Sequence, residues 1–116
     1  MSKSFREFTA IDRMVHEPAR LALLTALSAC ESADFLYLQR LIGLSKGNLS
    51  SHLAKLETAG LVQINKHFVG KVPQTTARLT EEGRTAIEQY WRQIDRLREA
   101  SFRLAPDTLK PIGDSA

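Results

Sequence analysis

The segment from Ile42 to Leu79 constrains the fold of this chain more than any other part of the sequence. Ser45 can accept a hydrogen bond from an amide in the first turn of a helix, and leucines follow it at helical spacing. Ala59 and Gly60 then supply a C-terminal stop. Two runs rich in β-branched and apolar residues come next, separated by a loop that contains glycine and proline. The segment therefore predicts a helix over 46–59 followed at once by a β-hairpin.

The two faces of the predicted helix differ in chemistry. Leu49, Leu53 and Leu56 form a stripe that we assign to the core. The opposite face carries short polar or cationic side chains without a carboxylate among them, which suits contact with a polyanion. The alternative is an ordinary solvated helix face. The polar and cationic positions are Lys46, Asn48, Ser50, Ser51 and Lys55.

Positive charge is concentrated in the same region. Between Arg40 and Arg78, six basic residues stand against the single acid Glu57, so this segment carries +5. Because the whole chain carries +3, the remaining residues sum to −2. This split predicts a local anion-binding surface. The alternative is that the six basic side chains are ordinary solvent-exposed surface residues. The six basic residues are Arg40, Lys46, Lys55, Lys66, Lys71 and Arg78.

Composition excludes several classes of protein. A chain of 116 residues, 43% hydrophobic and 25% charged, fits one globular domain. No apolar run approaches the ~20 residues of a membrane span, and the N-terminus lacks the apolar segment of a secretory signal. The single cysteine, Cys30, cannot form an intrachain disulfide and is expected to be an inert, buried helix-end residue. These features predict a cytoplasmic protein.

The other elements follow from local signals. Pro18 suits the first turn of a helix, Gly43 suits a helix end, and Thr80 suits an N-cap. Gly83 is expected to weaken the helix that Thr80 begins, and residues 69–73 are expected to interrupt strand pairing. In order, the predicted elements are a short helix or arm over 1–10, a buried helix over 11–30, a short strand over 35–37, a brief helix over 38–42, the helix over 46–59, strands over 61–64 and 75–79, a helix from 81 to about 104, and a flexible tail over 105–116.

This order of elements is that of a winged helix-turn-helix, and particular residues carry a resemblance. They are Leu49-Ser50-Ser51-His52-Leu53, Leu56-Glu57, Ala59-Gly60-Leu61-Val62, Lys66-His67-Phe68, Gly70-Lys71, Pro73, Thr75 and Leu79-Thr80-Glu81-Glu82-Gly83-Arg84. Over residues 18–86 the chain resembles winged-helix transcriptional regulators related to the ArsR and MarR families, and in particular a compact, single-domain bacterial and archaeal family. The expected fold is mainly α with a small β-hairpin (α+β). It comprises an arm over 1–10, the DNA-binding domain over 11–80 and a dimerisation helix over 81–104.

In such a fold the helix over 46–59 enters the major groove and the wing, residues 66–74, lies over phosphates or the minor groove. Asn48 suits adenine and Lys46 suits guanine. Gly47 would let the backbone approach phosphate, or it is simply tolerated in the first turn of the helix. His52 is at least as well explained by packing as by DNA contact. The predicted DNA-binding residues are Arg40, Lys46, Gly47, Asn48, Ser50, Ser51, His52, Lys55, Lys66, His67, Lys71 and Arg78.

The last helix has two interpretations. It could cover the core of its own domain, or it could pair with its twin across a two-fold axis. Its apolar residues exceed what one small domain needs, and the family resemblance implies dimerisation through this helix with help from the N-terminal arm. The predicted interface comprises Phe5, Phe8, Ile87, Tyr90, Trp91, Ile94 and Leu97.

Catalytic and metal-binding patterns are absent from the sequence. There is no phosphate-binding glycine loop, nucleophile elbow or set of clustered thiolates, and the three histidines lack ligand spacing. We therefore expect no enzyme activity, metal or cofactor, and leave open any small-molecule effector. The predicted function is a dimeric, sequence-specific regulator, most simply a repressor, that binds a double-stranded DNA operator. The alternative is a winged-helix module that binds another protein.

Overall fold

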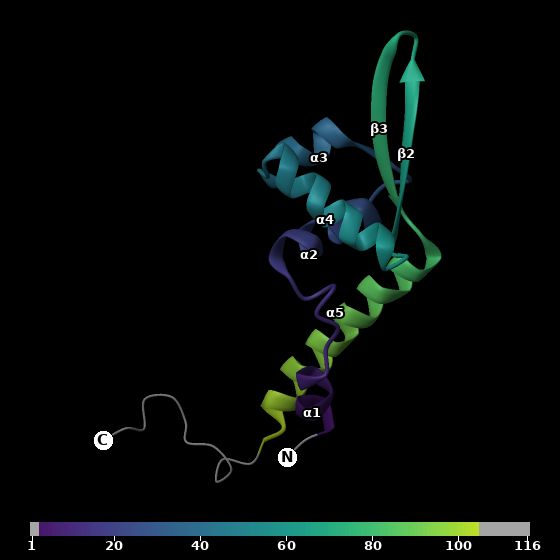
Figure 1. Ribbon diagram of the computed structural model, residues 1–116. Coiled ribbons are helices and arrows are strands. Elements are labelled where there is room, and N and C mark those ends of the chain that lie inside the picture. The colour runs from purple at the N-terminus through teal and green to yellow at the C-terminus, as the bar shows by residue number, and fades with distance from the viewer. Residues whose placement is uncertain (1–2, 105–116) are drawn as a thin grey trace, which may run out of the picture. The chain divides into compact units, whose positions relative to one another are not determined.

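A computed structural model describes residues 3–104 of the chain (Figure 1). These residues fall into two compact units, one spanning residues 12–90 and one formed by the N-terminal residues up to 11 with those from 91 onward. The elements are α1 (Lys3–Thr9), α2 (Pro18–Ser28), β1 (Ala33–Asp34), α3 (Phe35–Ile42), α4 (Lys46–Thr58), β2 (Val62–Val69), β3 (Val72–Leu79) and α5 (Glu81–Phe102). The predicted tail over 105–116 lies outside the described residues.

Helix α2 is shorter than predicted. Pro18 lies in its first turn, as expected, but the helix begins only there, because the preceding Glu17 caps it by accepting a 2.8 Å hydrogen bond from the Arg20 amide. Residues 11–17 are therefore not helical, and the helix ends at Ser28. Cys30 lies beyond that end and is exposed, so its predicted burial is wrong.

The predicted strand over 35–37 is also wrong. Helix α3 already begins at Phe35 because the Asp34 carboxylate accepts hydrogen bonds from the amides of Leu36, at 3.0 Å, and Tyr37, at 3.3 Å. The strand lies just before the helix, where Ala33 and Asp34 pair with β3. The end of α3 is as predicted: Gly43 adopts φ 76°, a left-handed conformation that suits glycine.

Helix α4 follows its prediction closely. Ser45 caps it through a 3.1 Å hydrogen bond from the Asn48 amide, and it ends at Thr58, one residue early. Leu49, Leu53 and Leu56 are buried in the core, as expected. They join the buried leucines of α2 and Leu38 of α3, which fixes the orientation of α4 against these helices.

The β2–β3 hairpin is longer than predicted. The three-stranded antiparallel sheet has the order β1-β3-β2, and β2 pairs with β3 from Val62–Leu79 to Val69–Val72. Only Gly70 and Lys71 form the turn, so the predicted interruption over 69–73 is wrong. In a hairpin with a two-residue turn, the two residues that flank the turn, here Val69 and Val72, are hydrogen-bonded to each other through their backbones. Such pairs alternate with pairs that make no backbone hydrogen bonds to each other, so Phe68 and Pro73 form a pair without them. The missing amide of Pro73 therefore removes no hydrogen bond between β2 and β3.

Helix α5 begins as predicted. The Thr80 hydroxyl accepts a 3.0 Å hydrogen bond from the Gly83 amide and donates a 2.6 Å bond to the Gly60 carbonyl. The helix ends at Phe102, two residues before the predicted end. No helix among the described residues is long and apolar enough to cross a membrane.

The unit that contains α1 is built on the second half of α5. The Arg96 guanidinium lies 3.4 Å from the Glu7 carboxylate, and Ala100 is buried. The N-terminal segment is therefore a short helix, one of the two predicted forms, which packs on this part of α5.

Candidate nucleic-acid interface

The outer face of α4 carries six of the predicted contact residues on the side opposite its leucine stripe. All six are exposed: Lys46, Gly47, Asn48, Ser50, Ser51 and Lys55. They lie together because the core holds the leucines, leaving the remaining helix positions to solvent. Lys46, Gly47 and Asn48 occupy the first turn, where amides and the positive end of the helix dipole also favour an anion.

His52 is the exception on α4. Its side chain is half-buried, and its Nδ1 atom lies 3.4 Å from an Arg20 guanidinium nitrogen and 3.7 Å from the Glu17 carboxylate. Arg20 is itself fixed by donating a 2.8 Å hydrogen bond from Nε to the Met14 carbonyl. These contacts favour the packing role of His52 between α4 and the start of α2.

Glu17 holds this cluster together as a carboxylate. Partial burial alone would raise the pKa of its carboxyl group. The backbone amides of Arg20 and Ala19, with the nearby side chains of His52 and Arg20, outweigh burial and leave the pKa of Glu17 below its ordinary value. The ionised cap therefore links the first turn of α2 to α4.

The hairpin supplies the second set of predicted residues. Lys66, His67 and Lys71 are exposed, as a wing requires. The His67 ring is held by a 3.0 Å hydrogen bond between its Nε2 and the Gln74 side-chain oxygen. Gln74 donates a 3.2 Å bond to the Asp34 carboxylate, which also caps α3. The wing is thus tied to the helical part of the same unit.

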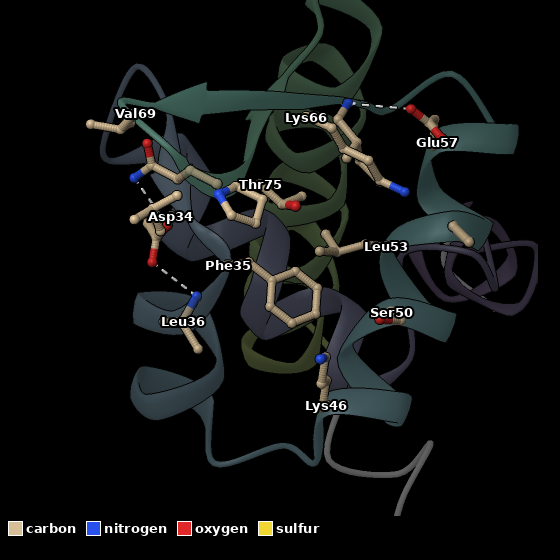
Figure 2. A pocket seen from close by; sticks show the side chains of 15 residues that line it. Asp34, Phe35, Leu36, Lys46, Ser50, Leu53, Glu57, Lys66, Val69 and Thr75 are labelled. Carbon is tan, nitrogen blue, oxygen red and sulfur yellow. Dashed lines mark hydrogen bonds between the residues drawn. The ribbon is translucent and has the colours of Figure 1, made fainter.

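A cleft of about 1220 Å³ separates α4 from the hairpin. Figure 2 shows Lys46 and Ser50 on the α4 side, Lys66 and Thr75 on the strand side, and Phe35 in between. The sequence alone does not predict this cleft, because the cleft depends on how far the hairpin stands from α4. No local pattern marks Phe35 as part of it.

Two carboxylates, Asp34 and Glu57, line the cleft together with its basic and polar side chains. The Glu57 carboxylate accepts a 3.3 Å hydrogen bond from the Ile64 amide, which joins the last turn of α4 to β2. The sole acid of the basic segment thus helps to position the wing.

The two arginines are not brought to this cleft. Arg40 is exposed in the last turn of α3. Arg78 lies on the opposite face of the hairpin from Lys66 and Thr75, where its Nε donates a 3.0 Å hydrogen bond to Gln63. DNA contact by these two residues stays a prediction.

The predicted dimer residues divide into two groups. Ile87 and Tyr90 are buried within the single chain, and the Tyr90 hydroxyl makes a 2.9 Å hydrogen bond with His16 Nδ1. Their assignment to a surface between chains is therefore corrected: they belong to the core of this chain. Trp91 is 42% exposed, and the others are half-buried. The half-buried positions are Phe5, Phe8, Ile94 and Leu97.

Comparison with known proteins identifies the family. Residues 19–97 match the family model described as a winged helix DNA-binding domain. The chain belongs to this family. This winged-helix chain is also 32% identical over 82 residues to the uncharacterized protein MJ0432 of Methanocaldococcus jannaschii. The match covers 71% of the chain and 89% of that relative.

Solved structures share the winged-helix fold. The transcriptional regulator homologue of Pyrococcus horikoshii OT3 matches with a TM-score of 0.77 at 24% identity, covering 85% of this chain and 97% of that one. The PcaV regulator of Streptomyces coelicolor, solved with its natural ligand, matches with a TM-score of 0.65 at 24% identity. This match covers 86% of this chain and 70% of that one. A mutant of MarR from E. coli, solved with operator DNA, matches with a TM-score of 0.57 at 21% identity. This match covers 72% of this chain and 61% of that one.

These findings confirm the predicted fold, mainly α with a small β-hairpin and a long C-terminal helix. The predicted membership of a winged-helix DNA-binding family is likewise confirmed by the family model that matches residues 19–97. Within residues 3–104 there is no group of three His, Cys, Asp or Glu side chains that could hold a metal ion.

Proposed function

We propose that this winged-helix protein binds a specific operator in double-stranded DNA as a homodimer and represses transcription by occupying it. The observation that carries the proposal is the exposed face of α4, which carries Lys46, Lys55 and several short polar side chains against the single acid Glu57 and lies across the cleft from Lys66 of the wing. A B-DNA major groove about 12 Å wide admits one helix, and its base edges can be distinguished. The cationic wing then has phosphates or the minor groove to contact.

Each residue of the outer face has a role that its chemistry suits. Asn48 would pair with adenine and Lys46 with guanine, while Ser50 and Ser51 would bond to bases or phosphates. Lys55, nearer the end of α4, would contact backbone phosphate. These assignments make the first turns of α4 the source of sequence specificity.

A two-fold dimer is supported by the accessible apolar side chains on the second half of α5, where Trp91 is exposed and Ile94 and Leu97 are half-buried. Trp91, Ile94 and Leu97 would pair with their counterparts, which places two α4 helices on half-sites about one turn of DNA apart. Such a protein acts by occupancy rather than by catalysis, and its site of action is the cytoplasm, where the operator lies.

Titration of labelled duplexes tests the proposal. Operator candidates recovered from a random DNA pool by the protein itself are compared with scrambled duplexes at two salt concentrations. Specific binding should exceed binding to the scrambled duplex by about 10³-fold or more, and both should weaken as salt rises. Binding that is absent, or unaffected by salt, would overturn the proposal.

A winged-helix protein-interaction module is the second candidate. It is favoured by exposed apolar side chains on α3, namely Leu36, Tyr37 and Leu41, each more than half exposed. Such a module would bind a protein partner with little dependence on salt and would recover no sequence from the random DNA pool. The same titration therefore separates the two functions.

A further inference from the structure

The tip of the hairpin, residues 68–73, is apolar where a solvated turn would be polar. Phe68 is 73% exposed, Val69 59% and Val72 65%, and Pro73 is exposed beside them. Isolated apolar side chains are common on protein surfaces, but a contiguous group marks a site of interaction. The exposed apolar tip therefore indicates a surface that another molecule covers.

The backbone gathers these side chains at the end of the β2–β3 hairpin. The two strands stay paired up to Val69 and Val72, and the turn closes through Gly70 at φ 64°. Phe68 and Pro73 are directly opposite each other in a pair without backbone hydrogen bonds, where side chains approach most closely. Phe68 and Pro73 therefore share one face of the hairpin tip, and Val69 and Val72 share the other. In Figure 1 the ends of β2 and β3 rise well beyond α3 and α4 of the same unit.

The charges around the tip indicate what kind of partner covers it. Lys71 lies in the turn, and Lys66 lies two residues from Phe68 on the same strand face. No acid occurs from Asn65 to Thr80. Ammonium groups around apolar side chains suit a polyanion with an apolar interior, which is what stacked base pairs between two phosphate strands present.

A second copy of the chain fits less well. Pro73 faces the open side of β3 without an amide, so a further strand cannot pair there regularly. The lysines of two tips would also repel each other.

We propose that the hairpin tip is an apolar wedge that enters the minor groove at one base step, with Phe68 and Pro73 partly unstacking that step and bending the duplex. This proposal rests on the DNA-binding function proposed above. Minor-groove proteins use phenylalanine and proline in this way and bend DNA by roughly 20–90° toward the major groove. Pyrimidine–purine steps unstack most easily, so the wedge would add sequence preference beside the bases that α4 reads.

Energy transfer between dyes at the two ends of a duplex recovered from the random pool measures the bend. 2-Aminopurine placed beside the flanking pyrimidine–purine step measures unstacking. The native protein should shorten the distance between the dyes and raise the 2-aminopurine emission. Phe68→Ala should abolish most of both signals and weaken binding about tenfold. Without the phenyl ring, no side chain would cover the base pairs that unstacking exposes. Phe68→Leu, which keeps an apolar wedge, should retain both signals.

Two controls make the result specific. Phe102→Ala removes a phenyl ring that is 78% exposed and lies outside the wing, and it should leave bend and emission unchanged. Lys71→Ala should weaken binding and its salt dependence while the remaining complex stays bent. Unbent DNA with the native protein, or a bend that Phe68→Ala leaves intact, would overturn the wedge while binding itself stands. Recovery of no specific duplex would instead overturn the DNA-binding function.

Discussion

Gly83 shows how a single residue can have a role that its local sequence conceals. A glycine in a helix is weaker than alanine by about 1 kcal/mol, and Gly83 was expected to weaken α5. In the structure, a Cβ atom at this position would lie 2.0 Å from the Leu61 carbonyl oxygen and 2.9 Å from its carbon. The glycine therefore lets the first turn of α5 pack directly against the backbone that joins α4 to β2.

Gly83→Ala should lower the free energy of unfolding by about 2 kcal/mol despite its better helix propensity, because backbone must move to admit the methyl group. Urea denaturation measures the change. Gly47→Ala is the matched control, since it adds the same methyl group to a helical glycine with open space around it. It should raise stability by up to about 1 kcal/mol. Equal effects of the two substitutions would show that the close contact with Leu61 does not matter.

Glu17 makes the stability of the fold depend on pH. Its pKa is lowered in the folded protein from the ordinary value of 4.5. Folding then favours the ionised form, so the contribution is fully present above pH 4.5 and is lost as pH falls through the folded value. Because the side chain is 30% exposed, solvent screening keeps this contribution below about 1 kcal/mol.

Glu17→Gln should lower the melting temperature at pH 7, and the difference from the native protein should shrink in strongly acidic solution. Thermal unfolding followed by circular dichroism over a series of pH values measures both. Other carboxylates titrate equally in the two proteins and so cancel. A difference that stayed constant with pH would mean that Glu17 acts only by its shape.

At the scale of elements, the accuracy of sequence reasoning depended on how local the deciding contact is. The cap at Ser45 and the helix end at Gly43 are set by neighbouring residues, and both were predicted correctly. The start of α3 was missed because the β-prone Phe35-Leu36-Tyr37 run outweighed the cap at Asp34. Pro73 was misjudged because its cost depends on the phase of strand pairing, which the turn sets.

The candidate site follows the same division. The outer face of α4 could be predicted because it is the complement of a leucine stripe. The packing of His52 against Arg20 and Glu17 could not, because these partners come from another helix. The cleft beside Phe35 likewise exists only once the hairpin is placed.

Helix α4 and the wing should differ in what they contribute to binding. Asn48→Ala should cost about 1–3 kcal/mol of discrimination between the operator and a scrambled duplex, because a base contact is lost. Lys66→Ala should weaken binding to both duplexes alike and reduce the slope of log affinity against log salt by about 0.9. Fluorescence anisotropy at several salt concentrations measures both quantities. If Lys66→Ala altered discrimination and Asn48→Ala only the slope, the proposed roles would be reversed.

At the scale of the whole molecule, the proposed binding to a palindromic operator would require two chains. With Ile87 and Tyr90 assigned to the core, the surface left for a partner on α5 is Trp91, Ile94 and Leu97. Burying these side chains between two copies would remove apolar area from water at a gain of about 25 cal/mol per Å².

The double substitution Trp91→Asp, Ile94→Asp should therefore convert a dimer into a monomer, because four carboxylates would meet in an apolar interface. Analytical ultracentrifugation measures the mass, and circular dichroism checks that the helix persists. Gln89→Asp is the control, since it adds a carboxylate at an exposed position of the same helix and should leave the dimer intact. The monomer should also lose affinity for a two-site operator while keeping its affinity for a single half-site, because only the dimer ties two α4 helices to one duplex. A native protein that sediments as a monomer, or a double variant with unchanged mass, would contradict dimerisation through α5.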